Sequence, residues 1–426
     1  MQYSTYQFDE LRQAPKQVFF PYRGRDYKVE YQAFCLPENQ GKTPVLFLGG
    51  AFQNFTSFRS EIELVLATHP IILADFPSQG CNDQLAPELG LGDFAHLIEQ
   101  FCQSYQLHKL SILGISYGSA MAMIFAGAHP ERMERLLLSG ITCFRRPGIV
   151  LLYKDLLEQL AAQNMEAFAT LAVCNLTNQT RMEECNISPS YRRMLYRQIS
   201  RLSENEQQRY AQNTQRILDF PGFESYPTCP TLISTGEFDN FTQPIENAAV
   251  AKQCPNATFA LVLGADHLAQ YERKEAASTL FHNFMCDLPV DNIPGVQVLD
   301  AHSFVQDNNH LQETKRPLEQ PFVLFDEASD KEHTVRIHSI NFTELTLELL
   351  TPSFDLNESN RSLYLALPET GHRYHVRILE REQKTLNCVF VQRELKAADA
   401  LLQYLNEYYL LVNQDGSLPN NQSKLA

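Results

Sequence analysis

A Gly-x-Ser-x-Gly motif occupies residues Gly114-Ile-Ser116-Tyr-Gly118, between the apolar run 110–113 and a long apolar segment. A buried strand, a tight turn and a helix in this order are what a nucleophile elbow requires. Glycine suits the two flanking positions because the strand and the helix nearly touch there. We therefore predict that Ser116 is a strained nucleophile at the apex of the turn. The alternative is a glycine-rich turn that carries an ordinary serine.

A serine hydroxyl becomes a good nucleophile when a base removes its proton, and that base is usually a histidine held by a carboxylate. After an elbow, the acid comes next in the chain and the histidine last. His267 follows the apolar run 259–263 and is the predicted base. Asp239 follows the run 231–234 and is the predicted acid, with Glu237 of the same loop as the alternative. Asp266 is expected to be a turn residue.

The negative charge that develops on a substrate oxygen needs two hydrogen-bond donors. One donor is the backbone N–H of the residue after the nucleophile, here Tyr117. The second comes from the loop after the first central strand, where Gly49-Gly50-Ala51 follows the run 45–48. We therefore predict that the N–H groups of Ala51 and Tyr117 form an oxyanion hole.

Elements that place these residues at strand ends are visible through the first two-thirds of the chain. Continuous apolar runs alternate with segments of helical length, which indicates a doubly wound α/β fold with a mostly parallel sheet. The expected strands are 45–48, 71–74, 110–113, 136–139, 231–234 and 259–263, with an edge hairpin at 17–22 and 27–36. The expected helices are 56–68, 91–107, 117–129, 244–253 and 269–285.

The rest of the chain is organised differently. Residues 145–226 contain amphipathic helical patterns without a strand, so we predict a helical lid inside a first domain of residues 1–288. Turn residues in 289–314 suggest a linker. Short alternating runs in 315–410 predict a small antiparallel β-barrel domain that ends in a helix around 397–407. The polar tail 411–426 is expected to be disordered.

The lid carries apolar side chains that are able to enclose an acyl chain or simply to pack on the sheet. These residues are Leu151, Leu152, Leu156, Leu157, Leu160, Phe168, Met194 and Leu195.

Composition narrows the function classes. The 426 residues carry a net charge of −15, which disfavours a nucleic-acid partner. No signal peptide and no apolar run long enough for a membrane span is expected. The ten cysteines never form a Cys-x-x-Cys motif, which favours reduced cysteines in a cytoplasmic protein. We expect neither a metal site nor a cofactor.

Residues 45–285 resemble the α/β-hydrolase superfamily in the order of these motifs. Within it, the chain resembles the hydroxyacyl acyltransferases of rhamnolipid biosynthesis. The similar segments are Gly50-Ala51 with Thr56-Ser-Phe58, Asp75-Phe-Pro77, Gly236-Glu-Phe-Asp239-Asn-Phe-Thr242 and Gly264-Ala-Asp-His267-Leu.

This resemblance implies an enzyme that joins 3-hydroxyacyl groups, delivered by acyl carrier protein, into a 3-(3-hydroxyalkanoyloxy)alkanoate. The elbow departs from that family because Gly-Ile-Ser-Tyr-Gly is the general hydrolase form. A carboxylesterase or thioesterase that uses the same triad is therefore the alternative. A non-catalytic binding protein with this fold is the third hypothesis.

A basic stripe lies in the predicted lid. Arg193, Arg197 and Arg201 recur every four residues and so share a helical face, with Arg192 beside them. Acyl carrier proteins are acidic, so the stripe is a candidate docking surface. The alternative is an ordinary solvated helix face.

The C-terminal segment resembles a PilZ domain, a small barrel that binds cyclic-di-GMP in many bacteria. Binding in that family uses an Arg-x-x-x-Arg segment before the barrel and an Asp-x-Ser-x-x-Gly turn. Here only Lys315 and Arg316 precede the barrel, and the turn reads Ser339-Ile-Asn341-Phe-Thr-Glu. Arg373 and Arg377 have the right spacing, but they sit within an expected strand. We expect a degenerate PilZ-like barrel without cyclic-di-GMP binding, which serves in protein contacts or lid packing.

Overall fold

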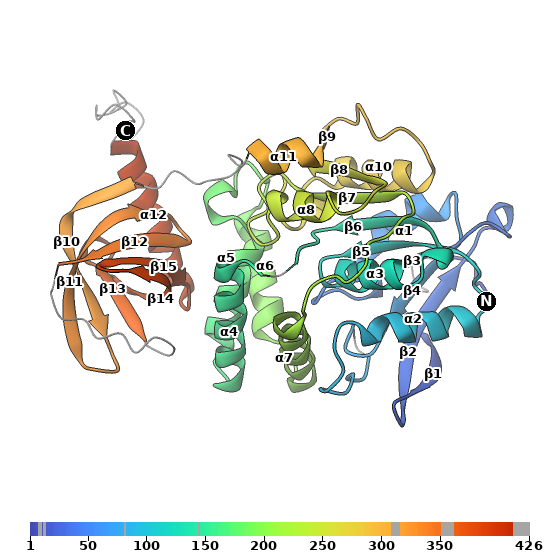
Figure 1. Ribbon diagram of the computed structural model, residues 1–426, viewed down its shortest axis with the longest axis horizontal. Coiled ribbons are helices and arrows are strands. Elements are labelled where there is room, and N and C mark those ends of the chain that lie inside the picture. The colour runs from blue at the N-terminus through green and yellow to red at the C-terminus, as the bar shows by residue number, and fades with distance from the viewer. Residues whose placement is uncertain are drawn as a thin grey trace.

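The computed structural model describes residues 1–6, 11, 14–80, 82–143, 145–307, 316–350 and 362–411. Two sheets organise them (Figure 1): a mostly parallel nine-stranded sheet and a closed antiparallel barrel near the C-terminus. The predicted fold class, a doubly wound α/β domain followed by a small antiparallel barrel, is confirmed.

The nine-stranded sheet has the order β1-β2-β4-β3-β5-β6-β7-β8-β9. Strands β3 to β8 pair in parallel, and β1, β2 and β9 add antiparallel edges. Every residue of β3, β4, β5 and β7 is buried, as expected for apolar strands covered on both faces. The bounds are β1 (Lys16–Tyr22), β2 (Arg25–Phe34), β3 (Val45–Leu48), β4 (Ile71–Asp75), β5 (Leu110–Ile115), β6 (Met133–Ser139), β7 (Thr231–Gly236), β8 (Ala257–Val262) and β9 (Val296–Leu299).

Helices cover both faces of this sheet and divide its apolar residues into two clusters. Helices α1 (Arg59–Leu66) and α10 (Lys274–Met285) pack in one cluster, and α2 (Asp93–Ser104), α3 (Tyr117–Ala128) and α8 (Pro244–Ala251) pack in the other. The helix expected over 269–285 is in fact two, because the backbone of Arg273 leaves the helical region between α9 (Ala269–Glu272) and α10.

The segment expected to be a linker contributes structure of its own. Strand β9 pairs antiparallel with β8, and α11 (Ala301–Asp307) follows it. The four residues of β9 are too few for a recognisable period, so only the free edge of β8 selects this strand. Residues 308–315 lie outside the described part of the chain.

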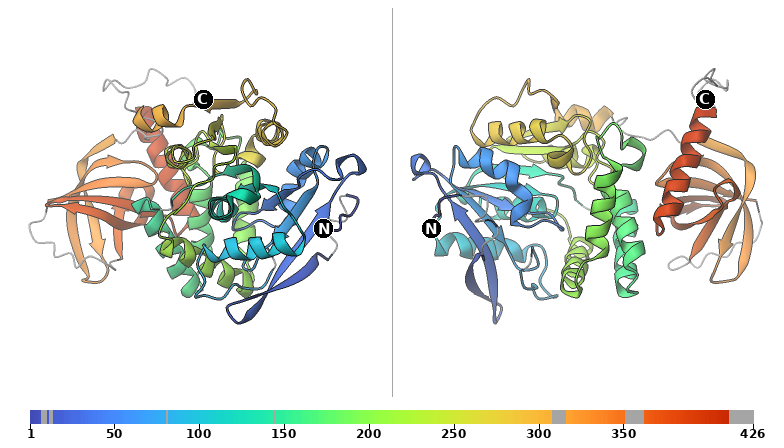
Figure 2. Two further views of the ribbon diagram at one scale, coloured as in Figure 1. Left: turned by 45° about the vertical axis from the view of Figure 1, so that its right-hand side comes forward. Right: turned by 180° about the vertical axis from the view of Figure 1, so that it is seen from behind.

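The predicted helical lid follows β6. It consists of α4 (Pro147–Ala161), α5 (Met165–Leu176), α6 (Pro189–Ser200) and α7 (Glu204–Asp219). Side-chain caps begin three of these helices, at Asn164, Ser188 and Ser203. The lid lies between the sheet and the C-terminal barrel in both the front and the rear view (Figures 1 and 2).

The barrel has the strand order β10-β11-β12-β15-β14-β13 and closes by antiparallel pairing of β10 with β13. Alternate residues of its strands face the interior, as in the buried Leu345, Leu347 and Leu349 of β12. Helix α12 (Leu395–Leu411) packs Leu401 and Leu405 into the same core. The bounds are β10 (Arg316–Asp326), β11 (Lys331–Ile340), β12 (Glu344–Leu349), β13 (Leu363–Leu367), β14 (His372–Glu382) and β15 (Thr385–Val391). The tail expected to be disordered lies, from residue 412, outside the described residues.

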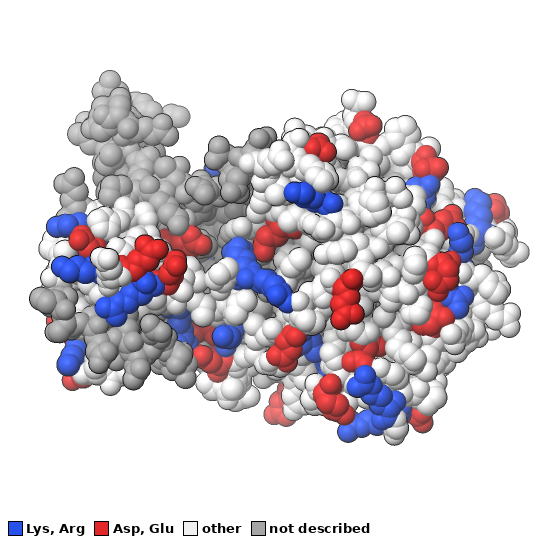
Figure 3. Space-filling model, viewed as in Figure 1, with Lys and Arg blue, Asp and Glu red and all other residues white. Residues whose placement is uncertain are grey.

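The surface mixes both signs of charge. Figure 3 shows acidic and basic side chains interspersed over one face of the molecule. Within the described ranges, no helix is both long and apolar enough to cross a membrane.

Candidate active site

Ser116 stands at a sharp turn between β5 and α3. Its φ of 50° lies in the left-handed region, which is strained for a residue with a side chain and costs about 1–3 kcal/mol. A Cβ added to Gly118 would lie 2.2 Å from the carbonyl oxygen of Leu48, and one added to Gly114 would lie 2.7 Å from the Gly118 oxygen. Only glycine fits both positions, so the packing of strand against helix holds the turn in this shape.

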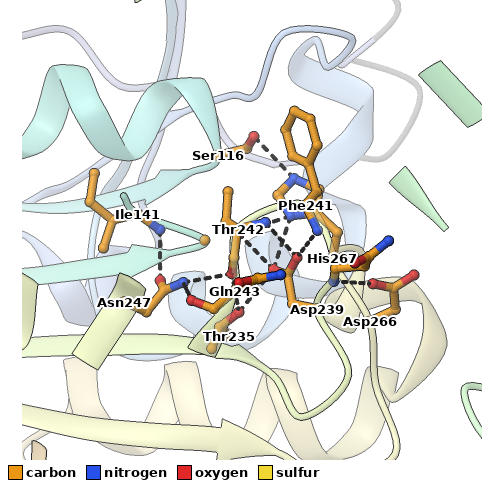
Figure 4. A network of polar contacts seen from close by, with 12 residues as sticks. Ser116, Ile141, Thr235, Asp239, Phe241, Thr242, Gln243, Asn247, Asp266 and His267 are labelled. Carbon is orange, nitrogen blue, oxygen red and sulfur yellow. Dashed lines mark hydrogen bonds and ion pairs between the residues drawn. The ribbon is translucent and has the colours of Figure 1, made fainter. Parts of the chain in front are cut away.

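A chain of hydrogen bonds links the three residues that the sequence placed on separate strand ends (Figure 4). The Oγ atom of Ser116 lies 3.2 Å from Nε2 of His267, and Nδ1 of His267 lies 3.0 Å from Oδ2 of Asp239. Asp239 follows β7 and His267 follows β8, so parallel pairing brings both loops to the edge of the sheet that carries Ser116. Both of these side chains are buried.

Donors surround the carboxylate of Asp239. Its Oδ1 accepts from the backbone N–H groups of Phe241 and Thr242, at 2.9 and 2.7 Å, and its Oδ2 accepts from the hydroxyls of Thr235 and Thr242, at 2.9 and 2.6 Å. Burial alone would raise the pKa of Asp239, but the charge of His267 and hydrogen bonds from His267 and Thr242 lower it below its ordinary value. The site therefore favours a carboxylate that faces the imidazole.

Thr242 belongs to a segment that carries the family resemblance, but no role was predicted for it from the sequence. Its hydroxyl donates to Asp239 and also lies 3.1 Å from Nδ1 of His267, so it touches both members of the pair (Figure 4). A threonine three residues after the acid is too common a feature to be recognised without the fold.

The two other acidic residues considered near the site have different partners. Glu237 accepts a hydrogen bond from the N–H of Gly264 at 2.9 Å and so braces the histidine loop. Asp266 accepts from the backbone N–H of Asn240 at 3.2 Å and from that of Asn178, which joins the acid loop to the lid. Burial, then the charges of Asp239 and Glu272, raise the pKa of Asp266 well above its ordinary value.

The loop after β3 lies beside the serine. Ala51 and Tyr117 line the same cavity as Ser116, and the oxyanion hole formed by their N–H groups stays a prediction. The N–H of Gly50 is already occupied, because it donates to Oε1 of Gln53 at 2.7 Å. Gln53 is a second residue that sequence reasoning missed.

An apolar cavity of about 280 Å³ opens above Ser116 and His267. This volume is near the lower end of the roughly 300–1,000 Å³ that ligand pockets occupy. Of the lid residues considered for an acyl pocket, Leu152, Leu156, Met194 and Leu195 line it. The other four are Leu151, Leu157, Leu160 and Phe168; they do not line it, and Leu160 and Phe168 are buried in the hydrophobic core.

The basic stripe on α6 is smaller than the sequence suggested. Arg193, Arg197 and Arg201 are exposed. Arg192 is buried and pairs with Asp399 of α12 at 2.6 Å, so it faces the barrel and does not belong to an exposed docking surface. A four-residue period shows that Arg193, Arg197 and Arg201 share a helix face, but it does not show which element packs against the adjacent Arg192.

The barrel residues that were compared with the cyclic-di-GMP-binding motifs of PilZ domains make other contacts. Arg373 stacks over the ring of Phe325, with its guanidinium carbon 5.4 Å from the ring centre. Arg377 pairs with Asp155 of the lid at 3.1 Å. At the β11–β12 turn, Asn341 accepts from the backbone N–H groups of Thr343 and Glu344. Lys315 lies outside the described residues.

In the part of the chain that is described, no group of three or more His, Cys, Asp or Glu residues is arranged to hold a metal ion. The hydroxyl of Ser116 lies within hydrogen-bond distance of a histidine nitrogen, the arrangement that nucleophilic attack with a histidine as base requires.

Comparison with known proteins agrees with this geometry. The model of the alpha/beta hydrolase fold family matches residues 43–274. A 2-hydroxy-6-oxononadienedioate/2-hydroxy-6-oxononatrienedioate hydrolase of Cupriavidus pinatubonensis is 24% identical over 277 residues, which cover 61% of this chain and 93% of that protein. The poly(3-hydroxyalkanoate) polymerase subunit PhaC of Thiocystis violacea is 26% identical over 137 residues, which cover 29% of this chain and 37% of that protein.

Among solved structures, MGS-M2, an alpha/beta hydrolase enzyme from a deep-sea metagenome library, matches with a TM-score of 0.55. It is 18% identical, and the match covers 64% of this chain and 99% of that one. The family model spans more than half of the sequence and includes the elbow and both loops. The chain therefore belongs to the alpha/beta hydrolase fold family and is an enzyme of the hydrolase or acyltransferase kind.

Proposed function

We propose that this enzyme transfers acyl groups through a covalent acyl-enzyme on Ser116. In this proposal His267 is the general base, Asp239 orients and balances it, and the N–H groups of Ala51 and Tyr117 form the oxyanion hole. The hydrogen-bonded chain Ser116–His267–Asp239 at the floor of an apolar cavity carries the proposal. No cofactor is required.

The first half of the reaction loads the serine. Oγ of Ser116 attacks the carbonyl carbon of an acyl thioester while Nε2 of His267 takes the hydroxyl proton. The tetrahedral oxyanion receives hydrogen bonds from the two backbone donors. It then collapses, the carbon–sulfur bond breaks, and His267 returns the proton to the leaving thiol.

The second half transfers the acyl group. The hydroxyl of an acceptor gives its proton to His267 and attacks the acyl carbon, and the bond to Ser116 Oγ breaks as that oxygen regains a proton. We propose that the donor is a 3-hydroxyacyl thioester and that the acceptor is the hydroxyl of a second 3-hydroxyacyl group. The product of transfer is a 3-(3-hydroxyalkanoyloxy)acyl group, and cleavage of the acceptor's own thioester by water releases it as a 3-(3-hydroxyalkanoyloxy)alkanoate, a precursor of biosurfactant lipids. The apolar cavity, the resemblance to the rhamnolipid-pathway acyltransferases and the relative named as a 3-hydroxyalkanoate polymerase support this choice.

Hydrolysis is the second candidate. The elbow has the general hydrolase form, and a relative that matches over 93% of its own length is named as a hydrolase. In this case water replaces the acceptor hydroxyl in the second half, and the enzyme is an esterase or thioesterase with the same residues. Transfer requires that water be kept from the acyl-enzyme, which depends on the lid.

Two assays decide between these candidates. An alkyl fluorophosphonate should label the folded protein at Ser116, with Ser116→Ala as the control. Absence of labelling in folded protein would favour a non-catalytic binding protein. With 3-hydroxyacyl carrier protein as the substrate, an ester-linked dimer of hydroxy acids supports transfer, and free hydroxy acid alone supports hydrolysis.

The donor is proposed to be carried by acyl carrier protein. Arg193 and Arg197 are exposed on α6, and the neighbouring Met194 and Gln198 line the cavity, so a carrier held there would lie beside the pocket. Reversing both charges (Arg193→Glu with Arg197→Glu) should raise the KM for carrier-bound substrate and leave the KM for a soluble thioester unchanged. Arg25→Glu, an exposed change elsewhere, is the control, and equal effects on both substrates would contradict docking.

We propose that the reaction takes place in the cytoplasm. Each of the nine described cysteines is free, including the partly exposed Cys35, Cys143, Cys229 and Cys286, which favours a reducing compartment.

A further inference from the structure

The lid helices that wall the cavity are the same helices on which the C-terminal barrel rests. Figures 1 and 2 show the lid between the sheet on one side and the barrel on the other. Helices α4, α5 and α6 each contribute side chains to the cavity. Each of these three helices also contacts the barrel or α12. In each helix, the residue that makes this contact lies one to three positions in the sequence from a residue that lines the cavity.

The contact on α4 is an ion-pair cluster around Asp155, whose side chain is completely buried. Asp155 Oδ1 lies 2.6 Å from Nη2 of Arg393 and 3.1 Å from Nη2 of Arg377. Arg377 also pairs with the half-exposed Glu158, one turn along the same helix. The next residue after Asp155 is Leu156, which lines the cavity. A shift of the Asp155 backbone therefore moves a wall of the pocket.

The other two helices repeat this arrangement. On α5, Cys174 packs in the hydrophobic cluster of the barrel, while the adjacent Asn175 lines the cavity. On α6, the buried Arg192 pairs with Asp399 of α12 at 2.6 Å, while Leu195 lines the cavity. Three separate helices are thus held from outside by one body.

The ion-pair cluster should resist separation of α4 from the barrel, because a buried carboxylate that has lost its cationic partners is strongly unfavourable. Moving α4 away from the barrel would separate Asp155 from both guanidinium groups at once. Closely packed helices transmit such a constraint because packed interiors have little free volume. In many enzymes a lid opens and closes over the site. Here one face of the lid is anchored.

We propose that Arg377 and Arg393 of the barrel are positioning residues that set the acyl-chain specificity of the cavity by fixing α4. The barrel then supports the lid from outside, and its role is to keep α4, which forms one wall of the cavity, at a fixed distance from Ser116. The inference rests on the proposed function in that an acyl chain occupies this cavity, and it does not depend on whether the acceptor is an alcohol or water.

Chain-length kinetics provide the first test. Arg377→Met and Arg393→Met should each lower kcat/KM for a dodecanoyl p-nitrophenyl ester about 10-fold, mainly by raising KM. The kcat/KM for the butyryl ester should change less than about 2-fold. Arg393→Lys should restore part of the long-chain activity. Arg336→Met is the matched control, because Arg336 is half exposed and its ion pair among the described residues is with Glu348 of the barrel itself. Equal loss for both esters, or no loss, would overturn the inference.

Hydrogen exchange on the unmodified protein provides a test that needs no variant to fold. Saturating dodecanoate should slow amide exchange in α4 and also in β14 and β15, whereas butyrate should not. Slowing confined to the lid, or no slowing at all, would contradict the coupling. Ligand binding does not require Ser116 chemistry, so failure of the proposed function appears separately, as absence of fluorophosphonate labelling.

Discussion

The hydroxyl of Thr242 offers a direct test of how the acid–base pair is held. Thr242→Val keeps the shape of the side chain and removes one of the donors to Oδ2 of Asp239. A hydrogen bond to a charged group contributes about 1.5–3 kcal/mol, so the free energy of unfolding should fall by about that amount at pH 7. Urea unfolding measures this loss.

Thr235→Val is the matched control. Both hydroxyls donate to the same oxygen of Asp239, at 2.9 Å from Thr235 and 2.6 Å from Thr242, but only that of Thr242 also lies against Nδ1 of His267. The two variants should therefore lose similar stability. Activity should separate them, because only Thr242 restrains the imidazole.

The expected loss in kcat/KM is about 10-fold for Thr242→Val, which corresponds to about 1.4 kcal/mol of transition-state stabilisation. For Thr235→Val it should stay within about 3-fold. The assay is ester turnover at substrate concentrations well below KM, with fluorophosphonate labelling to count active sites. Equal losses of activity in the two variants would refute the assignment of an orienting role to Thr242.

Three further outcomes follow from the geometry. Gly118→Ala should abolish labelling of the serine because its Cβ would meet the backbone of Leu48 at 2.2 Å, whereas Gly92→Ala, with open space around it, should leave labelling intact. Burial raises the pKa of Glu61 from 4.5 to about 7, so the folded state loses stability as the pH rises from 4.5 to 7. Glu61→Gln removes this charge and should increase the free energy of unfolding by about 3 kcal/mol at pH 8.5, with no increase at pH 4. Urea unfolding at the two pH values measures the difference. Isothermal titration with cyclic-di-GMP should give no binding heat, and a saturable signal would contradict the barrel's expected loss of that ligand.

Buried parallel strands were predictable because covering both faces makes them continuously apolar. The elbow could be recognised for a related reason, since its two glycines are required by a close approach of strand and helix. Strand β9 could not be recognised, because its four residues are selected by the free edge of β8 and not by their own pattern.

Contacts between distant parts of the chain explain the other differences. Arg192 has the same type and spacing as the residues of the exposed stripe, yet Asp399 lies 207 residues away in the sequence and captures its side chain. Gln53 and Thr242 each bond a residue only three positions away, Gly50 and Asp239, but the loop conformations that bring these atoms together, and that set Thr242 against His267, depend on the rest of the fold. Residue type and local period contain no information about such partners.

The ion pair between the lid and the barrel has a consequence for the order of events during synthesis. Arg393 follows Asp155 by 238 residues, and at about 5–20 residues per second this separation amounts to about 10–50 s of translation. Throughout that interval Asp155 remains hydrated and the surface around Cys174 lacks its cover. The pocket wall therefore reaches its final position only after the segment around Arg393 has been synthesised and has folded onto the lid. A product of premature termination would have the elbow and both catalytic loops beneath an unsupported lid.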